Sequence, residues 1–183
     1  MASKYPQPED VQKMLFVSAS VDYGDKYIEH LLEQYKIYVS STEKISEQRQ
    51  KANEFFVAVN TALVAILGFV ATKTNSGEIT TLLTLASVAG VVMCYLWYRI
   101  VLSYDGLNTG KYKVIHMIEK RLPLGLYYTE WEVLGRGENK DIYWPVSRIE
   151  WRVPWIFVAI YGVLLLSVLP WHQILWLLSC PWS

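Results

Sequence analysis

His116 and Glu119 stand three residues apart, a spacing that places both side chains on one face of a helix. An imidazole and a carboxylate are both zinc ligands, so the pair could supply half of a metal site. The sequence holds no second such pair, so a complete site would need symmetry-related copies of the chain. The alternative is a solvated pair on a helix surface, which is the commoner use of this spacing.

Two further clusters carry ionisable side chains, Glu130-Trp131-Glu132 and Tyr104-Asp105. Neither completes a catalytic pattern, because the sequence contains no Ser–His–Asp order, Cys-x-x-Cys, HExxH motif or glycine-rich phosphate loop. The three histidines, His30, His116 and His172, all lie outside the segments predicted to cross a membrane. We therefore expect no enzyme, no catalytic residue, no cofactor and no bound metal.

The distribution of charge predicts an all-α membrane protein. The 183-residue chain is 52% apolar and 14% aromatic, more than a globular domain of this size usually carries. No Asp, Glu, Lys or Arg occurs from Val153 to Ser183, and residues 55–103 hold only three charged side chains. This segregation is typical of a chain surrounded by membrane lipid. Because the formal net charge is zero, we expect no nucleic acid partner.

One long helix is predicted over residues 25–72, where no Gly or Pro occurs between Asp25 and Leu67. A short helix starting at Pro8 precedes it, and Asp22 is the expected N-cap of the long helix. Apolar or small residues recur in steps of three and four, like a heptad seam. The seam consists of Ile28, Leu31, Tyr35, Tyr38, Thr42, Ile45, Ala52 and Phe56. Residues 55–72 would extend roughly 27 Å and form the first transmembrane helix.

The second transmembrane helix is predicted over residues 82–103, with Thr80 or Thr81 as its cap. Gly106 and Gly110 are expected to interrupt the helical structure after this span. A separate amphipathic helix should follow, and Pro123 should end that helix. Residues 126–134 predict a short helix, with a strand as the alternative because their apolar residues also alternate.

Ser147-Arg-Ile-Glu150 resembles a capping box in front of the third apolar run. The expected organisation is an N-terminal cytoplasmic helical region (1–54), a transmembrane hairpin (55–103), a cytoplasmic helical region (104–152), a third transmembrane helix (153–170) and a tail (171–183). The tail is too short to span. It predicts an interfacial helix held by tryptophans, and a re-entrant segment is the alternative.

The positive charges predict the orientation of these helices. Residues 1–54 carry seven Lys or Arg, residues 104–152 carry eight, and Arg99 lies beside the second group. The turn between the first two spans holds only Lys73, and the tail holds none. Positive residues stay in the cytoplasm, so the N-terminus is expected inside and the C-terminus outside.

The arrangement resembles the RipA family of small octameric bacterial inner-membrane proteins. The resemblance covers roughly residues 40–165 and rests on Ile45–Phe56 with Asn60-Thr61, on Ser103–Glu119, on Leu122-Pro123, on Glu130-Trp131, and on Glu150 with Pro154. It implies a ring-like homo-octamer in the inner membrane and no established catalytic activity. In that membrane, the C-terminus that the charges place outside would lie in the periplasm.

Candidate contacts between copies follow from polar and small residues in and near the spans. Asn60, a membrane-buried amide, could line a polar pore in a ring or make a single contact between helices. Arg49 occupies a seam position and could pair with a carboxylate of a neighbouring copy or of residues 104–152, and the alternative is interfacial anchoring. Small residues that permit close helix approach are Ala58, Ala62, Ala65 and Gly68 in the first span, and Ala86, Ala89 and Gly90 in the second. They could serve the hairpin, the oligomer or both.

These observations predict a homo-oligomer with a structural, scaffolding or interaction role toward a protein partner that the sequence does not identify. The alternative is an ion-conducting pore or membrane-permeabilising effector lined by the first transmembrane helix.

Overall fold

Helices are the only regular elements in the computed structural model, which describes residues 7–72, 77–139 and 141–168. The all-α prediction is confirmed for these ranges. The strand alternative at 126–134 is wrong, because helix α5 (Leu126–Val133) occupies that segment. The short helix expected at Pro8 is α1 (Pro8–Leu15). The tail predicted to lie at the interface, 171–183, is outside the described residues.

Two long helices carry most of the chain. α3 runs from Tyr27 to Ala71, as predicted, and α4 runs from Gly77 to Glu119. Each is long and apolar enough to cross a membrane, whereas α7 (Val153–Val168) is a shorter apolar helix. α7 extends to Val168, the last residue that the structure describes. The count of three transmembrane helices therefore stays a prediction.

The break expected at Gly106 and Gly110 is wrong, because α4 passes through both. A glycine inside a helix costs about 1 kcal/mol relative to alanine, and packing against α3 outweighs that cost. Asn108 and Ile115 of this segment are buried. The Asn108 Nδ2 also donates to Ser46 Oγ at 3.3 Å.

Three predicted helix starts differ from the observed ones. Asp22 lies inside the short helix α2 (Ser20–Tyr23) and does not cap α3. Neither Thr80 nor Thr81 caps α4, because the helix already begins at Gly77 and the Thr81 hydroxyl donates back to the Gly77 carbonyl at 3.1 Å. Ser147 is the first residue of α6 (Ser147–Glu150), where Val146 holds the N-cap position. α4 and α6 therefore start earlier than the predicted cap residues suggested, whereas α3 starts later.

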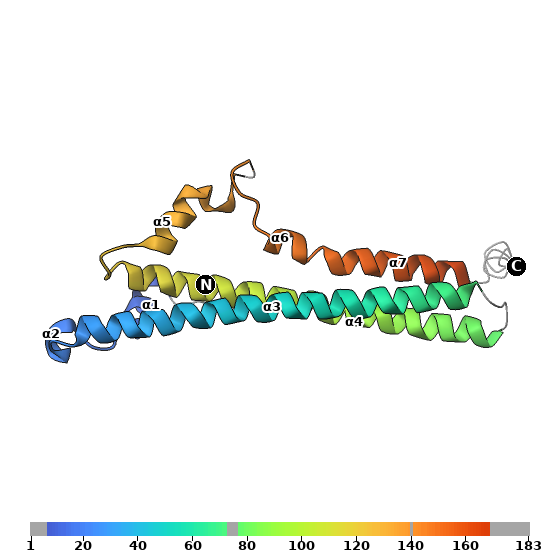
Figure 1. The fold of residues 1–183 in the computed structure, drawn as a ribbon, viewed down its shortest axis with the longest axis horizontal. Helices are drawn as coiled ribbons and strands as arrows, with labels where there is room; N and C mark the ends of the chain where they lie inside the picture. Colours follow the sequence, from blue (N-terminus) through green and yellow to red (C-terminus); the bar gives the residue numbers. More distant parts are fainter. Residues whose placement is uncertain (1–6, 73–76, 140, 169–183) are drawn as a thin grey trace, which may run out of the picture. The chain divides into compact units, whose positions relative to one another are not determined.

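The chain divides into two compact units, whose helices are labelled in Figure 1. The polar unit comprises residues 1–49 and 103–145, and therefore α1, α2, the first part of α3, the last part of α4, α5 and the 3₁₀ turn η1 (Gly135–Gly137). The apolar unit comprises residues 50–102 and 146–183, and within its described part α6 and α7 accompany the remainder of α3 and α4. Assignment of these units to cytoplasm and membrane stays a prediction.

Each unit has its own interior. The apolar unit is built around Leu67, Leu83, Cys94 and Tyr161, which come from α3, α4 and α7. In the polar unit, α3 packs its seam on α4: Thr42 is buried, and Lys111 Nζ donates to Ser41 Oγ while lying 4.4 Å from the centre of the Tyr38 ring. Ile28, which is 57% exposed, is the seam residue that remains largely uncovered.

Candidate functional site

Asn60 joins three helices of the apolar unit. Its side chain is fully buried on α3. Its Oδ1 accepts a hydrogen bond of 3.0 Å from the Tyr161 hydroxyl of α7 and one of 3.4 Å from the Cys94 thiol of α4. Its Nδ2 donates to the Phe56 carbonyl at 2.8 Å. The amide is thus bonded to α4 and α7 within one chain, and a role of Asn60 in lining a pore stays a prediction.

Gly90 allows α7 to approach α4 closely at this point. A Cβ built on Gly90 would lie 2.4 Å from Cζ of Tyr161, closer than any real contact. The Tyr161 ring therefore packs on the bare backbone of α4, and its hydroxyl continues to Asn60. A side chain at position 90 would displace the ring and the hydrogen bond together.

A second polar contact joins α3 and α4 near Trp97. The Trp97 side chain is 1% exposed, and its Nε1 donates to Asn53 Oδ1 at 2.8 Å. Its ring is stacked on Phe56, with centroids 5.7 Å apart, and contacts Phe157 of α7 at 6.0 Å. Trp97 Nε1 and Asn53 Oδ1 bond to each other inside the chain, so the cluster fixes the helices of one subunit.

The small residues of the first span point outward. Ala58, Ala62, Ala65 and Gly68 of α3 are all exposed in the single chain, and a Cβ on Gly68 would meet nothing within 4 Å. Large exposed side chains flank them, with Phe55 60% and Phe69 64% exposed. Nothing in the described part of one chain covers this face.

The small residues of the second span behave differently. Gly90 is buried under Tyr161, and Ala86 is partly buried against the core of the apolar unit. Ala89 is exposed. Gly90 and Ala86 therefore serve packing within the subunit, whereas the residues named on α3 remain available for contacts between subunits.

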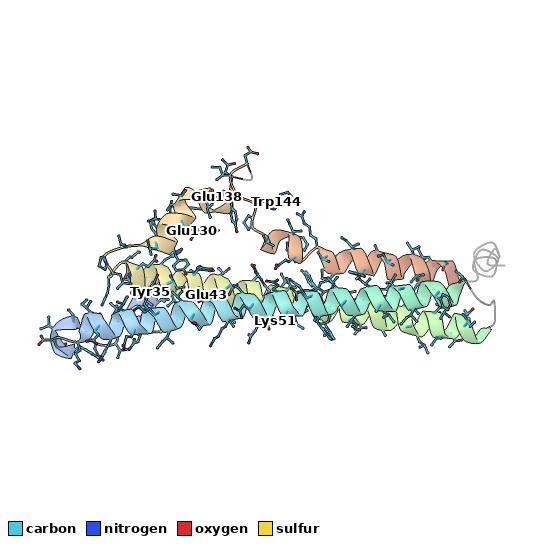
Figure 2. All side chains as sticks on the ribbon, in the orientation of Figure 1. Tyr35, Glu43, Lys51, Glu130, Glu138 and Trp144 are labelled. Atoms are coloured by element: carbon cyan, nitrogen blue, oxygen red, sulfur yellow. The ribbon has the colours of Figure 1, made fainter. Side chains whose placement is uncertain are left out.

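In the polar unit, Glu119 is the residue that joins separate elements. It is 3% exposed at the end of α4. Its Oε1 accepts hydrogen bonds from the Tyr35 hydroxyl and the Tyr127 backbone N–H, and its Oε2 accepts one from the Tyr128 N–H, each at 2.9 Å. Tyr127 and Tyr128 belong to the first turn of α5, whose N–H groups have no partner within the helix. Glu119 therefore caps α5 from α4 and holds Tyr35 of α3. Figure 2 labels Tyr35.

Burial, followed by the hydrogen bond to Glu119 and the charge of that carboxylate, raises the pKa of Tyr35 above its ordinary value. Burial removes water that would solvate a phenolate, and the neighbouring carboxylate repels it. Tyr35 therefore stays a neutral donor through the physiological range. This arrangement excludes the solvated His116–Glu119 pair as an interpretation, because Glu119 is buried and its oxygens are used by α3 and α5.

His116 takes a different partner. Its ring meets the Tyr128 ring edge-on, with centroids 5.7 Å apart. Among the described residues, no group of three His, Cys, Asp or Glu side chains is placed to hold a metal ion. Arg49 is partly buried on α3, and its positive charge acts on the Tyr112 phenol of α4. A role for Arg49 between copies stays a prediction.

Comparison with known proteins identifies this arrangement at the level of a family. A family model described as the octameric membrane protein family (8xMP) matches residues 32–170, which include most of α3 and all of α4, α5 and α7. No curated protein and no solved structure matches the chain. The match confirms the octameric membrane family expected from the sequence, while the finer resemblance to RipA proteins stays a prediction.

Proposed function

Because the chain belongs to the octameric membrane protein family, we propose that it assembles as a homo-octamer in the bacterial inner membrane and acts there as a scaffold. In this proposal it carries out no catalysis and instead gathers a protein partner or organises the surrounding membrane. The observation that carries the proposal is the family match, which covers both long helices.

The outward face of α3 supports an assembly through the spans. Association in lipid depends on close packing, and small residues let helix backbones approach each other. Ala58, Ala62 and Ala65 are spaced four and three residues apart, so they share one face of α3. Because none of the described residues covers that face, a second copy can pack on it without displacing a contact that the structure describes.

Mass measurement of the purified protein tests the assembly. We expect one species in detergent whose protein mass is eight times the 21.2 kDa of the chain. Ala62→Leu should reduce this species. Ala159→Leu, the same change at an exposed position of α7, should leave it intact. A monomer at every concentration would refute the octamer, and an octamer unaffected by Ala62→Leu would remove the interface from this face of α3.

The orientation belongs to the same proposal. The charge of residues 1–54 and 104–152 favours their placement in the cytoplasm, with the C-terminus in the periplasm. Once Cys94 and Cys180 are replaced by serine, a cysteine introduced at Ser40, which is exposed on α3, should be protected from an impermeant thiol reagent in intact cells and react after lysis. Labelling of intact cells at this position would reverse the proposed orientation.

A pore lined by α3 is the second candidate, and the exposed hydroxyl of Thr61 favours it. Thr61 lies three residues after Ala58 on the uncovered side of the helix, whereas Asn60 is occupied inside the subunit. An octamer that surrounded a channel with this face would conduct ions in reconstituted vesicles. Thr61→Val should then alter the flux. Leak equal to that of empty vesicles would exclude a pore and leave the scaffold.

A further inference from the structure

The polar unit contains a cavity of about 310 Å³ whose walls are mainly aromatic. Tyr112 of α4, Tyr127 and Trp131 of α5, and Tyr143 from the segment after η1 line it. Glu130 and His116 also line the cavity. Its volume lies at the lower end of the range for ligand pockets, so it suits a small molecule.

The aromatic rings are held in place by contacts with one another and with residues outside the cavity. Tyr112 and Tyr127 lie with ring centroids 5.9 Å apart and planes inclined by 56°, so they form two walls that meet at an angle. The backbone of Tyr127 is fixed by its hydrogen bond to Glu119. Tyr143 is positioned by a turn in which its N–H donates to the Asn139 carbonyl at 3.1 Å.

Trp131 is supported by a special backbone conformation. Gly135, Arg136 and Gly137 all have positive φ, at 63°, 55° and 68°. A Cβ on Gly137 would lie 3.3 Å from the Trp131 ring and 3.0 Å from Pro145. The glycine therefore lets the tryptophan pack against the returning chain. Arg136, whose φ is unusual for a residue with a side chain, is held by a 2.9 Å ion pair with Glu132.

The charges around the cavity are mainly negative. Glu130 lines it, and Glu43 of α3 acts on both Tyr112 and Tyr127. Figure 2 labels these two carboxylates on α3 and α5. Burial is the main cause that raises the pKa values of the two phenols, and Glu130 and Glu43 raise them further. Arg49 lowers the pKa of Tyr112 and is the opposing charge. An anionic ligand would be repelled by the two carboxylates.

We propose that this cavity binds a small organic cation with a methylated ammonium group, which the faces of the four aromatic rings surround while Glu130 supplies the opposite charge. Aromatic faces attract cations through their quadrupoles, and methylated ammonium groups are the ligands for which cages of this kind are used. A metal ion is a poorer candidate, because the described residues offer no group of three ligands. The site goes beyond the scaffold proposal and is independent of the octamer, since every wall belongs to one chain.

Two sources supply this chemistry, a dissolved quaternary ammonium compound and the choline headgroup of a lipid. Choline should bind to the full-length protein in a maltoside detergent, as measured by calorimetry. Its uncharged carbon analogue, 3,3-dimethylbutan-1-ol, should bind at least roughly tenfold more weakly, since it lacks the charge on which cation–π attraction depends. In nanodiscs, a choline headgroup that occupies the cavity would compete with added choline. A lower apparent affinity for choline in phosphatidylcholine than in phosphatidylglycerol would therefore identify the lipid headgroup as the ligand. Equal affinities assign the dissolved cation.

Matched variants locate the site. Glu130→Gln and Trp131→Leu should each weaken choline binding roughly three- to tenfold, the range for one charge or one ring in a cage. Glu138→Gln and Trp144→Leu change the same residue types at exposed positions outside the cavity, and should leave the affinity unchanged. Hydrogen exchange of α5 checks that the variants keep their fold.

Three outcomes would overturn the proposal. One is binding of the uncharged analogue as tight as that of choline. Another is the absence of choline binding in both detergent and nanodiscs. The third is a result in which Glu130→Gln and Trp131→Leu both retain the fold and bind choline as tightly as their control variants. The mass of the protein, measured on the same samples, shows separately whether the octamer has formed.

Discussion

The capping of α5 by Glu119 leads to a quantitative prediction for Glu119→Gln. A glutamine has one carbonyl oxygen and one NH₂ group, so it cannot accept at both former oxygen positions. With its oxygen at the Oε1 position it keeps the bonds from Tyr35 and Tyr127, and its NH₂ group then faces the Tyr128 N–H. The opposite orientation loses two bonds, so we expect the first. The variant should therefore lose the Tyr128 bond and the charge that strengthens the others.

The size of the expected effect on local opening of α5 follows from the hydrogen bond and the charge that are lost. A hydrogen bond to a charged group contributes about 1.5–3 kcal/mol, and about 1.4 kcal/mol corresponds to a factor of ten. Local opening of the first turn of α5 should therefore become roughly 10- to 100-fold more frequent in Glu119→Gln. Hydrogen exchange followed by NMR or by mass spectrometry measures this directly, and the amide of Tyr128 should lose more protection than that of Tyr127.

Glu138→Gln is the matched control, because it changes the same residue type at an exposed position that lies after α5 and away from its first turn. Exchange at Tyr128 should be unchanged in this control. If Glu119→Gln leaves the exchange of Tyr127 and Tyr128 as it is in the unaltered protein, Glu119 does not cap α5 and the reasoning is wrong.

Three further predictions concern stability. Gly90→Ala should lower the melting temperature of the detergent-solubilised protein, because overpacking costs about 1–3 kcal/mol of stability. Gly106→Ala, in open space on α4, should raise the melting temperature through a gain of about 0.5–1 kcal/mol. Equal effects of the two variants would contradict the packing at Gly90. Because the pKa of Tyr35 in the fold lies above its ordinary value of 10, its contribution to stability is complete below about pH 10 and is lost as pH rises beyond it. Tyr35→Phe should show a flatter alkaline decline in chemical denaturation, and an identical decline would refute this role. Asn53→Leu should cost about 1–3 kcal/mol in the same assay, because it leaves the buried Trp97 Nε1 without its acceptor, and unchanged stability would show that the bond contributes nothing.

The long helices could be predicted where the sequence lacks both helix breakers and competing signals. α3 was predictable from the absence of Gly and Pro between Asp25 and Leu67, since no local feature opposes the helix. α4 was predicted to end near Gly106 and Gly110, because the low helix propensity of glycine was the only signal in that part of the sequence. The contacts that outweigh it, such as Asn108 with Ser46, join residues 62 positions apart, and no periodicity in a single segment reveals them.

The role of Glu119 was hidden for the same reason. Its spacing from His116 suggested a shared helix face, and a helix face carries no information about what approaches it. The approach of Tyr35 and of the α5 amides depends on the turn after α4, in which Leu122 N–H returns to the Glu119 carbonyl. A buried carboxylate with several donors becomes visible only when those elements are brought together. The aromatic cavity is a comparable case, since its walls come from three segments that each look like ordinary apolar sequence.

The small residues of the two spans show how far a pattern alone can go. Both spans carry Gly and Ala at helical spacing, and the sequence could not decide which set serves the subunit and which serves its neighbours. The structure separates them by one residue in particular, because Tyr161 fills the space above Gly90 and bonds to Asn60. Once α7 occupies that side, the uncovered small residues of the hairpin lie mainly on α3, at Ala58, Ala62, Ala65 and Gly68. Since lipid gives packed helices no hydrophobic advantage, a face on which backbones can approach closely is where association between copies gains most, and in the proposed assembly that face is the one on α3.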